Sequence, residues 1–327
     1  MAMSPPKVPY TKPHLSLSEQ IAKLRSRGLA VNDETKARHY LSIVGYYRLS
    51  SYCYRLEEPP TANCRSHKFR DGTSFDDVIR LYVFDQRLRS LMLEALERFE
   101  IAARTVWAHE LSAAYGPHAF LNPQHFEVRE TYAKNLVALF SETRNAVKTS
   151  EEVAHYHEHY NDPELPPVWT LVSLMSFGEL FHWIRNTAST PVKLKVAQAF
   201  GFSNIQLFES VARSLNVVRN ICAHHGRLWD QRLTMRMPLI EKYLIVPMVA
   251  VQKPAQVEAD NRMYNCIAVL AHILLTLTAD SSWPQRVGRL VADHLTPREQ
   301  QLFMGFPKDW QNTPFWHSYV TEGDNMR

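Results

Sequence analysis

The sequence has few cysteines, and their arrangement excludes two classes of protein. The four cysteines form no Cys-x-x-Cys pair, so neither a zinc ribbon nor a disulfide framework is expected. Hydrophobic residues make up 45% and charged residues 21% of the 327 residues, which excludes wholesale disorder. Scattered cysteines without a paired motif are typical of a protein of the reducing cytosol. The cysteines are Cys53, Cys64, Cys222 and Cys266.

Long hydrophobic runs are also lacking. The longest apolar stretch, Cys266 to Ala279, is too short to cross a bilayer, which takes about 20 residues, and it contains His272. A buried helix is the better interpretation. Residues 1–15 hold several prolines and no apolar core, so they predict a flexible arm and no signal peptide. We therefore expect a soluble, cytoplasmic protein.

Glycine is scarce, with 10 in the chain, and no strand-like alternation or hairpin turn is convincing. Helical spacing predicts an all-α fold. One helix is expected from an N-cap at Ser18 to Gly28, one from Asp33 through Leu56, and a loop from Glu57 to Gly72. About 40 residues after Thr73 form the strongest helical pattern, long enough that we expect a bend or break. Further helices are predicted at 128–160, 168–187, 191–200, 203–225, 255–279 and 284–295.

The net charge of +4 is small, but its distribution is uneven. Between residues 213 and 236 there are five arginines and a single acid, Asp230. The guanidinium fork matches phosphate oxygens, so this cluster suits RNA binding. The alternative is a solvated face with a few ion pairs. The arginines are Arg213, Arg219, Arg227, Arg232 and Arg236.

Within this cluster, residues 214–230 read SLNVVRNICAHHGRLWD and place polar residues on a largely apolar helix. Asn216, Asn220 and His224 lie four positions apart, so they form one line along it. A neutral histidine can take the proton of a ribose 2′-OH, and Arg219 can hold the scissile phosphate. The motif therefore suits metal-free RNA cleavage. The alternative is that Arg219 and the histidines cap and pack the helix end.

Several blocks of the chain resemble the Abi-like family of bacterial abortive-infection proteins (AbiD/AbiF type), and the Arg–His motif resembles the signature of the HEPN superfamily. The blocks occur in the family's order and together span roughly residues 10 to 310. They are LSEQIAKLRSRGL, IVGYYRLSSY, the segment 71–116, VWTLVSLMSFGEL, RNICAHHGRLWD and MGFPKDW.

The resemblance implies an all-α helical bundle of HEPN type with N- and C-terminal helical extensions. It also implies a metal-independent endoribonuclease that leaves 2′,3′-cyclic phosphate ends and acts as a toxin-like effector of phage defence. By this likeness Arg219 binds phosphate, Asn220 assists and His224 is the acid–base. His225 also fits the permitted spacing, and Asn216 supports from the same face. The implied parts are an arm (1–15), an N-terminal helical segment with a basic loop (16–72), a HEPN-like core (73–240) and C-terminal helices (241–327).

A second Arg-x4-His spacing occurs at Arg104 and His109. HEPN sites are commonly composite, so this motif is a candidate for the facing half of the site, within one chain or across a homodimer. The alternative is that Arg104 pairs with Glu100 and Glu97, which precede it on the same helix face. Both can hold, because HEPN sites often have a carboxylate that arranges the arginine.

Weaker candidates lie elsewhere. The basic loop with Arg65, Lys68 and Arg70 could contact RNA phosphates. His155 and His159, with His157 between them, have the spacing of two metal ligands on a helix, but no third ligand supports a metal hydrolase. We expect no metal and no cofactor.

Two further expectations concern partners and the alternative function. A nuclease that arrests its own cell must be held inactive, so an antitoxin protein or an associated non-coding RNA is expected beside the RNA substrate. The alternative function is a non-catalytic RNA-binding module that uses the same arginine cluster.

Overall fold

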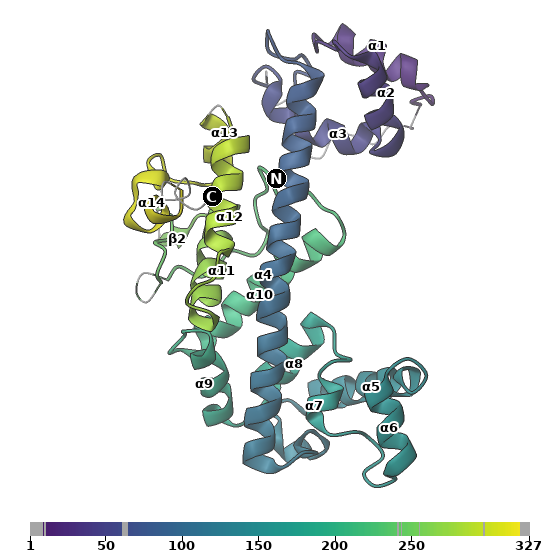
Figure 1. Ribbon diagram of the computed structural model, residues 1–327, viewed down its shortest axis with the longest axis vertical. Helices are drawn as coiled ribbons and strands as arrows, with labels where there is room; N and C mark the ends of the chain where they lie inside the picture. Colours follow the sequence, from purple (N-terminus) through teal and green to yellow (C-terminus); the bar gives the residue numbers. More distant parts are fainter. Residues whose placement is uncertain are drawn as a thin grey trace. The chain divides into compact units, whose positions relative to one another are not determined.

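The structure is a computed structural model that describes residues 9, 11–60, 65–240, 242, 244–254, 256–296 and 298–320. Most of the predicted arm at residues 1–15, and Cys64, lie outside these residues. The described residues are mainly helical, with a single two-stranded sheet among them, so the predicted all-α class is confirmed (Figure 1). The chain divides into two compact units, Met1–Phe84 and Asp85–Arg327.

The first unit contains three short helices, α1 (Leu17–Ser26), α2 (Glu34–Ile43) and α3 (Tyr46–Cys53), with a 3-10 turn at Tyr54–Leu56. Helix α1 begins earlier than predicted. Its N-cap is Ser16 and not Ser18, because Ser16 and Glu19 form a reciprocal capping box.

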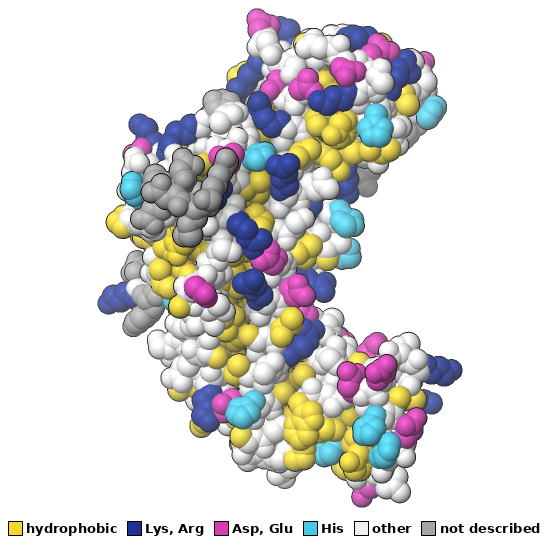
Figure 2. Space-filling view, in the orientation of Figure 1, with side chains coloured by type: hydrophobic (Ala, Val, Ile, Leu, Met, Phe, Trp, Pro, Cys, Tyr) yellow, Lys and Arg dark blue, Asp and Glu magenta, His cyan; other side chains and the backbone are white. Residues whose placement is uncertain are grey.

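The single helix predicted from Asp33 to Leu56 is also wrong. Gly45 interrupts it with a φ of 87°, a left-handed conformation that glycine adopts without steric cost. Basic and acidic side chains are interspersed on the face of this unit that Figure 2 shows, in keeping with the ion pairs that Glu34 forms with Arg25 and Arg38.

Helix α4 (Phe75–Tyr115) runs for 41 residues without the predicted break. Neither proline nor glycine occurs within it, so nothing interrupts its backbone hydrogen bonds. Buried side chains recur every three or four residues along its Asp85–Tyr115 part, from Leu88 through Met92, Leu96 and Phe99 to Leu111. This continuous apolar stripe lets the other helices of the second unit pack along it.

The predicted helix at 128–160 is two helices, and so is the one at 168–187, where a capping box at Ser176 and Glu179 starts a new helix. The antiparallel hairpin β1–β2 was not expected. The remaining elements are η2 (Ala119–Leu121), η3 (Pro123–His125), α5 (Arg129–Ala146), α6 (Glu151–His159), α7 (Val168–Leu171), α8 (Phe177–Asn186), α9 (Thr190–Ala199), α10 (Ile205–Ala223), β1 (Ala250–Gln252), β2 (Val257–Ala259), α11 (Met263–Leu277), α12 (Trp283–His294), α13 (Glu299–Phe303), η4 (Trp310–Asn312) and α14 (Pro314–Val320).

The core of the second unit contains a cluster of phenylalanines around Phe99 of α4. Its ring contacts those of Phe177 and Phe181 on α8, Phe200 after α9 and Phe208 on α10, at centroid separations of 4.9 to 6.2 Å. These contacts fix α8 and α10 beside α4.

Helix α11 is buried along most of its length, as predicted for the apolar stretch Cys266–Ala279. The helix predicted at 255–279 is wrong in its first part, because strand β2 occupies Val257–Ala259 and the helix begins at Met263. Among the residues described, no helix is long and apolar enough to cross a membrane.

Candidate functional site at the end of helix α10

Helix α10 forms because its two faces differ in polarity. Asn204 caps its N-terminus by accepting a hydrogen bond from the Leu207 N–H, at 2.8 Å. One face is buried, and this face carries Phe208, Val211, Leu215, Val218 and Cys222. The opposite face carries the polar residues of the motif, so packing of the apolar face sets the direction in which the motif points.

The polar line predicted on α10 is confirmed as far as His224. The His224 N–H donates to the Asn220 carbonyl at 3.0 Å, so the helical spacing continues to this residue, the C-cap. Asn216 is half-buried, whereas Asn220 and His224 are exposed. His224 therefore shares a face with both asparagines, and His225 does not.

The chain leaves the helix at His225, which has a φ of 56°. The Gly226 N–H donates to the Ile221 carbonyl at 2.7 Å, and the His225 N–H donates to the Cys222 carbonyl at 3.0 Å. This is the Schellman arrangement, with histidine at the left-handed position that glycine usually occupies. Gly226 is required for another reason: a Cβ there would lie 2.8 Å from Cγ2 of Ile221.

A buried ion pair that sequence reasoning missed holds the loop after the motif. Asp85 of α4 accepts hydrogen bonds from the N–H groups of Leu228 and Trp229, at 2.9 and 2.7 Å, and pairs with Arg89. Arg89 in turn donates to the Gly226 carbonyl at 3.3 Å. A signal was present in the sequence, since a charged pair four residues apart interrupts the apolar stripe of α4.

Glu100 on α4 brings the arginines of the two motifs together within one chain. One carboxylate oxygen contacts Arg104 Nη2 at 2.5 Å, and the other lies 4.0 Å from Arg219 Nε. Arg104 also donates to the carbonyls of Val172 and Met175, at 2.7 and 2.6 Å. Arg104 therefore fixes the segment before α8, and Glu100 is positioned to orient Arg219.

The side chains of the α10 motif are open. Arg219 has Glu100 at ion-pair distance and donates no hydrogen bond to any described residue. The side chains of Asn220 and His224 likewise make no hydrogen bond or ion pair within the described part of the chain. The amide of Asn220 and the imidazole of His224 are exposed, so these groups are available to a ligand.

The two residues of the second motif, Arg104 and His109, lie in different environments. The predicted pairing of Arg104 with Glu100 is confirmed, whereas Glu97 is exposed and forms no ion pair with a described residue. His109 is exposed, nine positions from Glu100 along the helix, which is about 13 Å of axial rise. His109 is therefore distant from Glu100 in this chain, and a catalytic role in a facing half-site stays a prediction for a dimer.

The other members of the arginine cluster differ in environment. Arg236 pairs with Glu258, and its carbonyl accepts a hydrogen bond from Ser214 at 2.8 Å. Arg227 is half-buried, and Arg213 and Arg232 are exposed. The cluster is thus not a single uniform face.

The basic loop of the first unit has internal carboxylate partners. Arg65 binds both oxygens of the buried Glu57 at 2.6 Å, Lys68 pairs with Glu58 at 2.6 Å, and Arg70 donates to the Glu57 carbonyl at 3.1 Å. RNA binding by these three residues stays a prediction, and it would have to compete with these contacts.

The remaining histidine and cysteine candidates show no metal cluster. The rings of His155 and His159 are in contact at a centroid separation of 4.2 Å, and no group of three or more metal-ligating side chains occurs in the part of the chain that is described. Burial raises the pKa of the Cys222 thiol to about 12, as expected for a small core residue.

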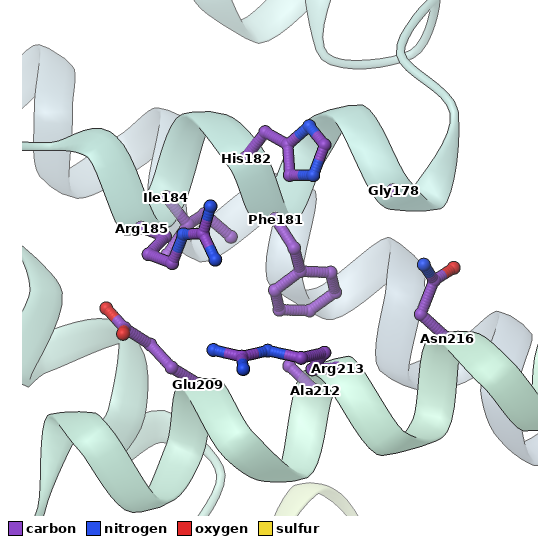
Figure 3. Close-up of a pocket in the computed structure, with 9 residues that line it drawn as sticks. All are labelled: Gly178, Phe181, His182, Ile184, Arg185, Glu209, Ala212, Arg213 and Asn216. Atoms are coloured by element: carbon purple, nitrogen blue, oxygen red, sulfur yellow. The ribbon is translucent and has the colours of Figure 1, made fainter. Parts of the chain in front are cut away.

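A hollow next to the motif opens between α8 and α10 (Figure 3). Its volume is about 130 Å³, and its polar lining comes from His182 and Arg185 on α8 and from Glu209, Arg213 and Asn216 on α10. Sequence reasoning identified Arg213 and Asn216 but missed the other three, which only the packing of α8 against α10 brings into the same hollow.

These features define an all-helical protein with an open arginine–histidine motif at a helix end. The model of the Abi-like protein family matches residues 39–230, more than half of the chain, so the chain belongs to this family. The matched range ends at Asp230, directly after the motif, whereas the blocks at 17–29 and 304–310 lie outside it. No curated protein and no solved structure matches the chain.

Proposed function

We propose that this protein is a metal-independent endoribonuclease of HEPN type that acts as a toxin-like effector of abortive infection. The observation that carries the proposal is the contrast between engaged and open groups. Arg89 and Arg104 hold neighbouring segments, while the side chains of Arg219, Asn220 and His224 make no hydrogen bond within the described part of the chain. Membership in the Abi-like family supports the role in phage defence.

The proposed reaction is an internal transesterification of RNA. Neutral His224 takes the proton of the ribose 2′-OH, and the 2′-oxygen bonds to phosphorus as the bond from phosphorus to the 5′-oxygen breaks. That oxygen leaves with a proton from the protonated His224 or from His225. The products are a 2′,3′-cyclic phosphate and a 5′-hydroxyl.

Arg219 supplies the electrostatic part of the mechanism. Its guanidinium balances the charge that grows on the phosphate oxygens in the transition state. Glu100 limits where that guanidinium can lie, because Glu100 is itself fixed by Arg104. In this mechanism Asn220, one residue further along α10, donates its amide N–H to the phosphate.

The test is cleavage of end-labelled single-stranded RNA and tRNA in EDTA by the wild type and by His224→Ala. We expect cleavage by the wild type alone, with 2′,3′-cyclic phosphate ends, and none where the nucleotide before the cut is 2′-deoxy. Binding without cleavage by both proteins would replace the nuclease with a non-catalytic RNA-binding module.

We also propose a controlling partner, an antitoxin protein or a non-coding RNA, because uncontrolled cleavage would arrest the host cell. A homodimer with a composite site, in which the α10 motifs of two copies face each other, belongs to the same proposal. Co-expression tests this part: growth arrest by the wild type should be relieved by the partner and absent with His224→Ala.

A further inference from the structure

Two arginines from different helices face the hollow between α8 and α10. Figure 3 shows Arg185 on α8 and Arg213 on α10 reaching toward the space between the helices, with the Glu209 carboxylate near Arg185. Both arginines are exposed, and neither makes a hydrogen bond or ion pair with a described residue. Two guanidinium groups without partners around one hollow form a site for an anion.

The hollow continues in both directions along α10. At one end it reaches Asn216, which begins the polar line of the motif. At the other it shares Arg185 and Glu209 with a larger hollow of about 570 Å³, where Lys193 forms an ion pair with Glu127 at 2.6 Å. Arg213 and Arg219 are six residues apart, about 9 Å along the helix axis. They are also about 120° apart around that axis, so Arg185 and Arg213 line a hollow beside the motif that continues away from it along α10.

We propose that this hollow and its continuation form a groove that holds the phosphodiester backbone of the RNA strand beside the bond that is cut, with Arg185 and Arg213 as phosphate ligands. The inference rests on the proposed function, since it assigns the strand's path from the same site. A positively charged groove that follows the backbone is the usual way in which proteins hold single strands.

The hollow between Arg185 and Arg213 has the dimensions of a phosphate site, and the larger hollow that adjoins it has room for a neighbouring nucleotide of the same strand. Pockets that enclose a small ligand have volumes of about 300–1,000 Å³, whereas the hollow between Arg185 and Arg213 has about 130 Å³. That is room for a phosphate group, with the sugar and base outside. Since the groove is open toward the motif, a backbone can continue from one phosphate position to the next.

Glu209 allows a second test, in which the substitution should strengthen RNA binding and not weaken it. It lies in the same hollow, half-buried, and burial raises the pKa of its carboxyl above the usual value, an effect that Lys193, Arg185 and Arg213 oppose. Its carboxylate forms no ion pair within 4 Å with a described residue. When ionised it repels a phosphate beside the two arginines, so removing its charge must strengthen RNA binding.

The experiment measures binding of a fluorescent 2′-O-methyl RNA oligomer, which cannot be cleaved, by anisotropy over a range of salt concentrations. Arg185→Ala/Arg213→Ala should bind about tenfold more weakly, with a salt slope shallower by about 0.7 for each phosphate that the variant no longer neutralises. Glu209→Gln should bind severalfold more tightly. Arg144→Ala removes an exposed arginine of α5 and is the matched control, expected to bind as the wild type does.

Equal affinities for the double variant and Arg144→Ala would overturn the proposal. So would tighter, Arg185/Arg213-dependent binding of AMP than of the oligomer, which would assign the hollow to a free nucleotide. Because the oligomer cannot be cut, the result is separate from the nuclease proposal. Loss of binding in the double variant supports the groove even if the wild type cleaves no RNA.

Discussion

The two Arg-x4-His motifs have the same spacing and opposite environments. Arg104 lies in the middle of α4, where Glu100 and two backbone carbonyls take its donors. Arg219 lies near the end of α10, with Glu100 at 4.0 Å and no hydrogen bond to a described residue. The same spacing therefore occurs in two different environments. The guanidinium of Arg219, near the end of α10, is open, whereas that of Arg104, within α4, binds structural partners.

The largest expected effect is on the rate of RNA cleavage, which should depend on Arg219. Arg219→Ala should lower the rate of RNA cleavage by about 10²–10³-fold, because it removes the charge that stabilises the transition state. The fold should persist, since Glu100 keeps Arg104 as its partner. Single-turnover cleavage with Arg144→Ala as control measures this. A loss of less than threefold would mean that Arg219 does not hold the scissile phosphate.

The second effect is on the free energy of unfolding, which should depend more on Arg104 than on Arg219. Arg104→Ala should lower the free energy of unfolding by about 2–3 kcal/mol, because it leaves a largely buried carboxylate and two carbonyls without their donors. Arg219→Ala should cost less than about 1 kcal/mol, because its interaction is long and partly exposed. Urea unfolding followed by circular dichroism gives both values, and equal losses would remove the distinction.

A double-mutant cycle sharpens the same contrast at Glu100. Combining Glu100→Gln with Arg104→Ala should give a coupling energy of about 1–2 kcal/mol, because these side chains are in contact. The cycle with Arg219→Ala should give about 0.5 kcal/mol or less, as expected for an exposed pair. If the Arg219 cycle gave the larger coupling, Glu100 would belong chiefly to the open motif.

The smallest effect concerns the turn that ends the open motif. His225→Gly should unfold with a free energy about 1 kcal/mol higher than His225→Ala, because glycine adopts the left-handed backbone without strain. Both variants lack the imidazole, so their difference isolates the backbone. Thermal unfolding of the pair measures it, and no difference would show that the turn relaxes.

Much of this fold follows from local patterns in the sequence. The apolar stripe of α4 and the buried run in α11 are periodic or continuous, and both formed helices as predicted. The errors have local causes. Gly45 divides a pattern that otherwise reads as one helix, and the capping box of Ser16 with Glu19 fixes an earlier start. The short β1–β2 hairpin offers too few residues for alternation to be recognised.

The candidate site was predictable only in part, because its supporting contacts are long-range. The polar line on α10 requires nothing beyond helical spacing. Asp85 binds the N–H of Leu228, which is 143 positions away, and no sequence pattern links the two. Arg185 and Arg213 meet in one hollow only because α8 packs against α10. Open and engaged arginines look alike in sequence, and packing alone distinguishes Arg219 from Arg104.

We propose that the motif of Arg219 and His224 on α10, and not that of Arg104 and His109 on α4, carries the chemistry. The most direct test compares His224→Ala with His109→Ala in single-turnover cleavage of the same RNA in EDTA. We expect a loss of about 10²–10⁴-fold for His224→Ala and a rate within about threefold of wild type for His109→Ala. An equally large loss in both variants would contradict it and would indicate a composite site to which both motifs contribute a histidine.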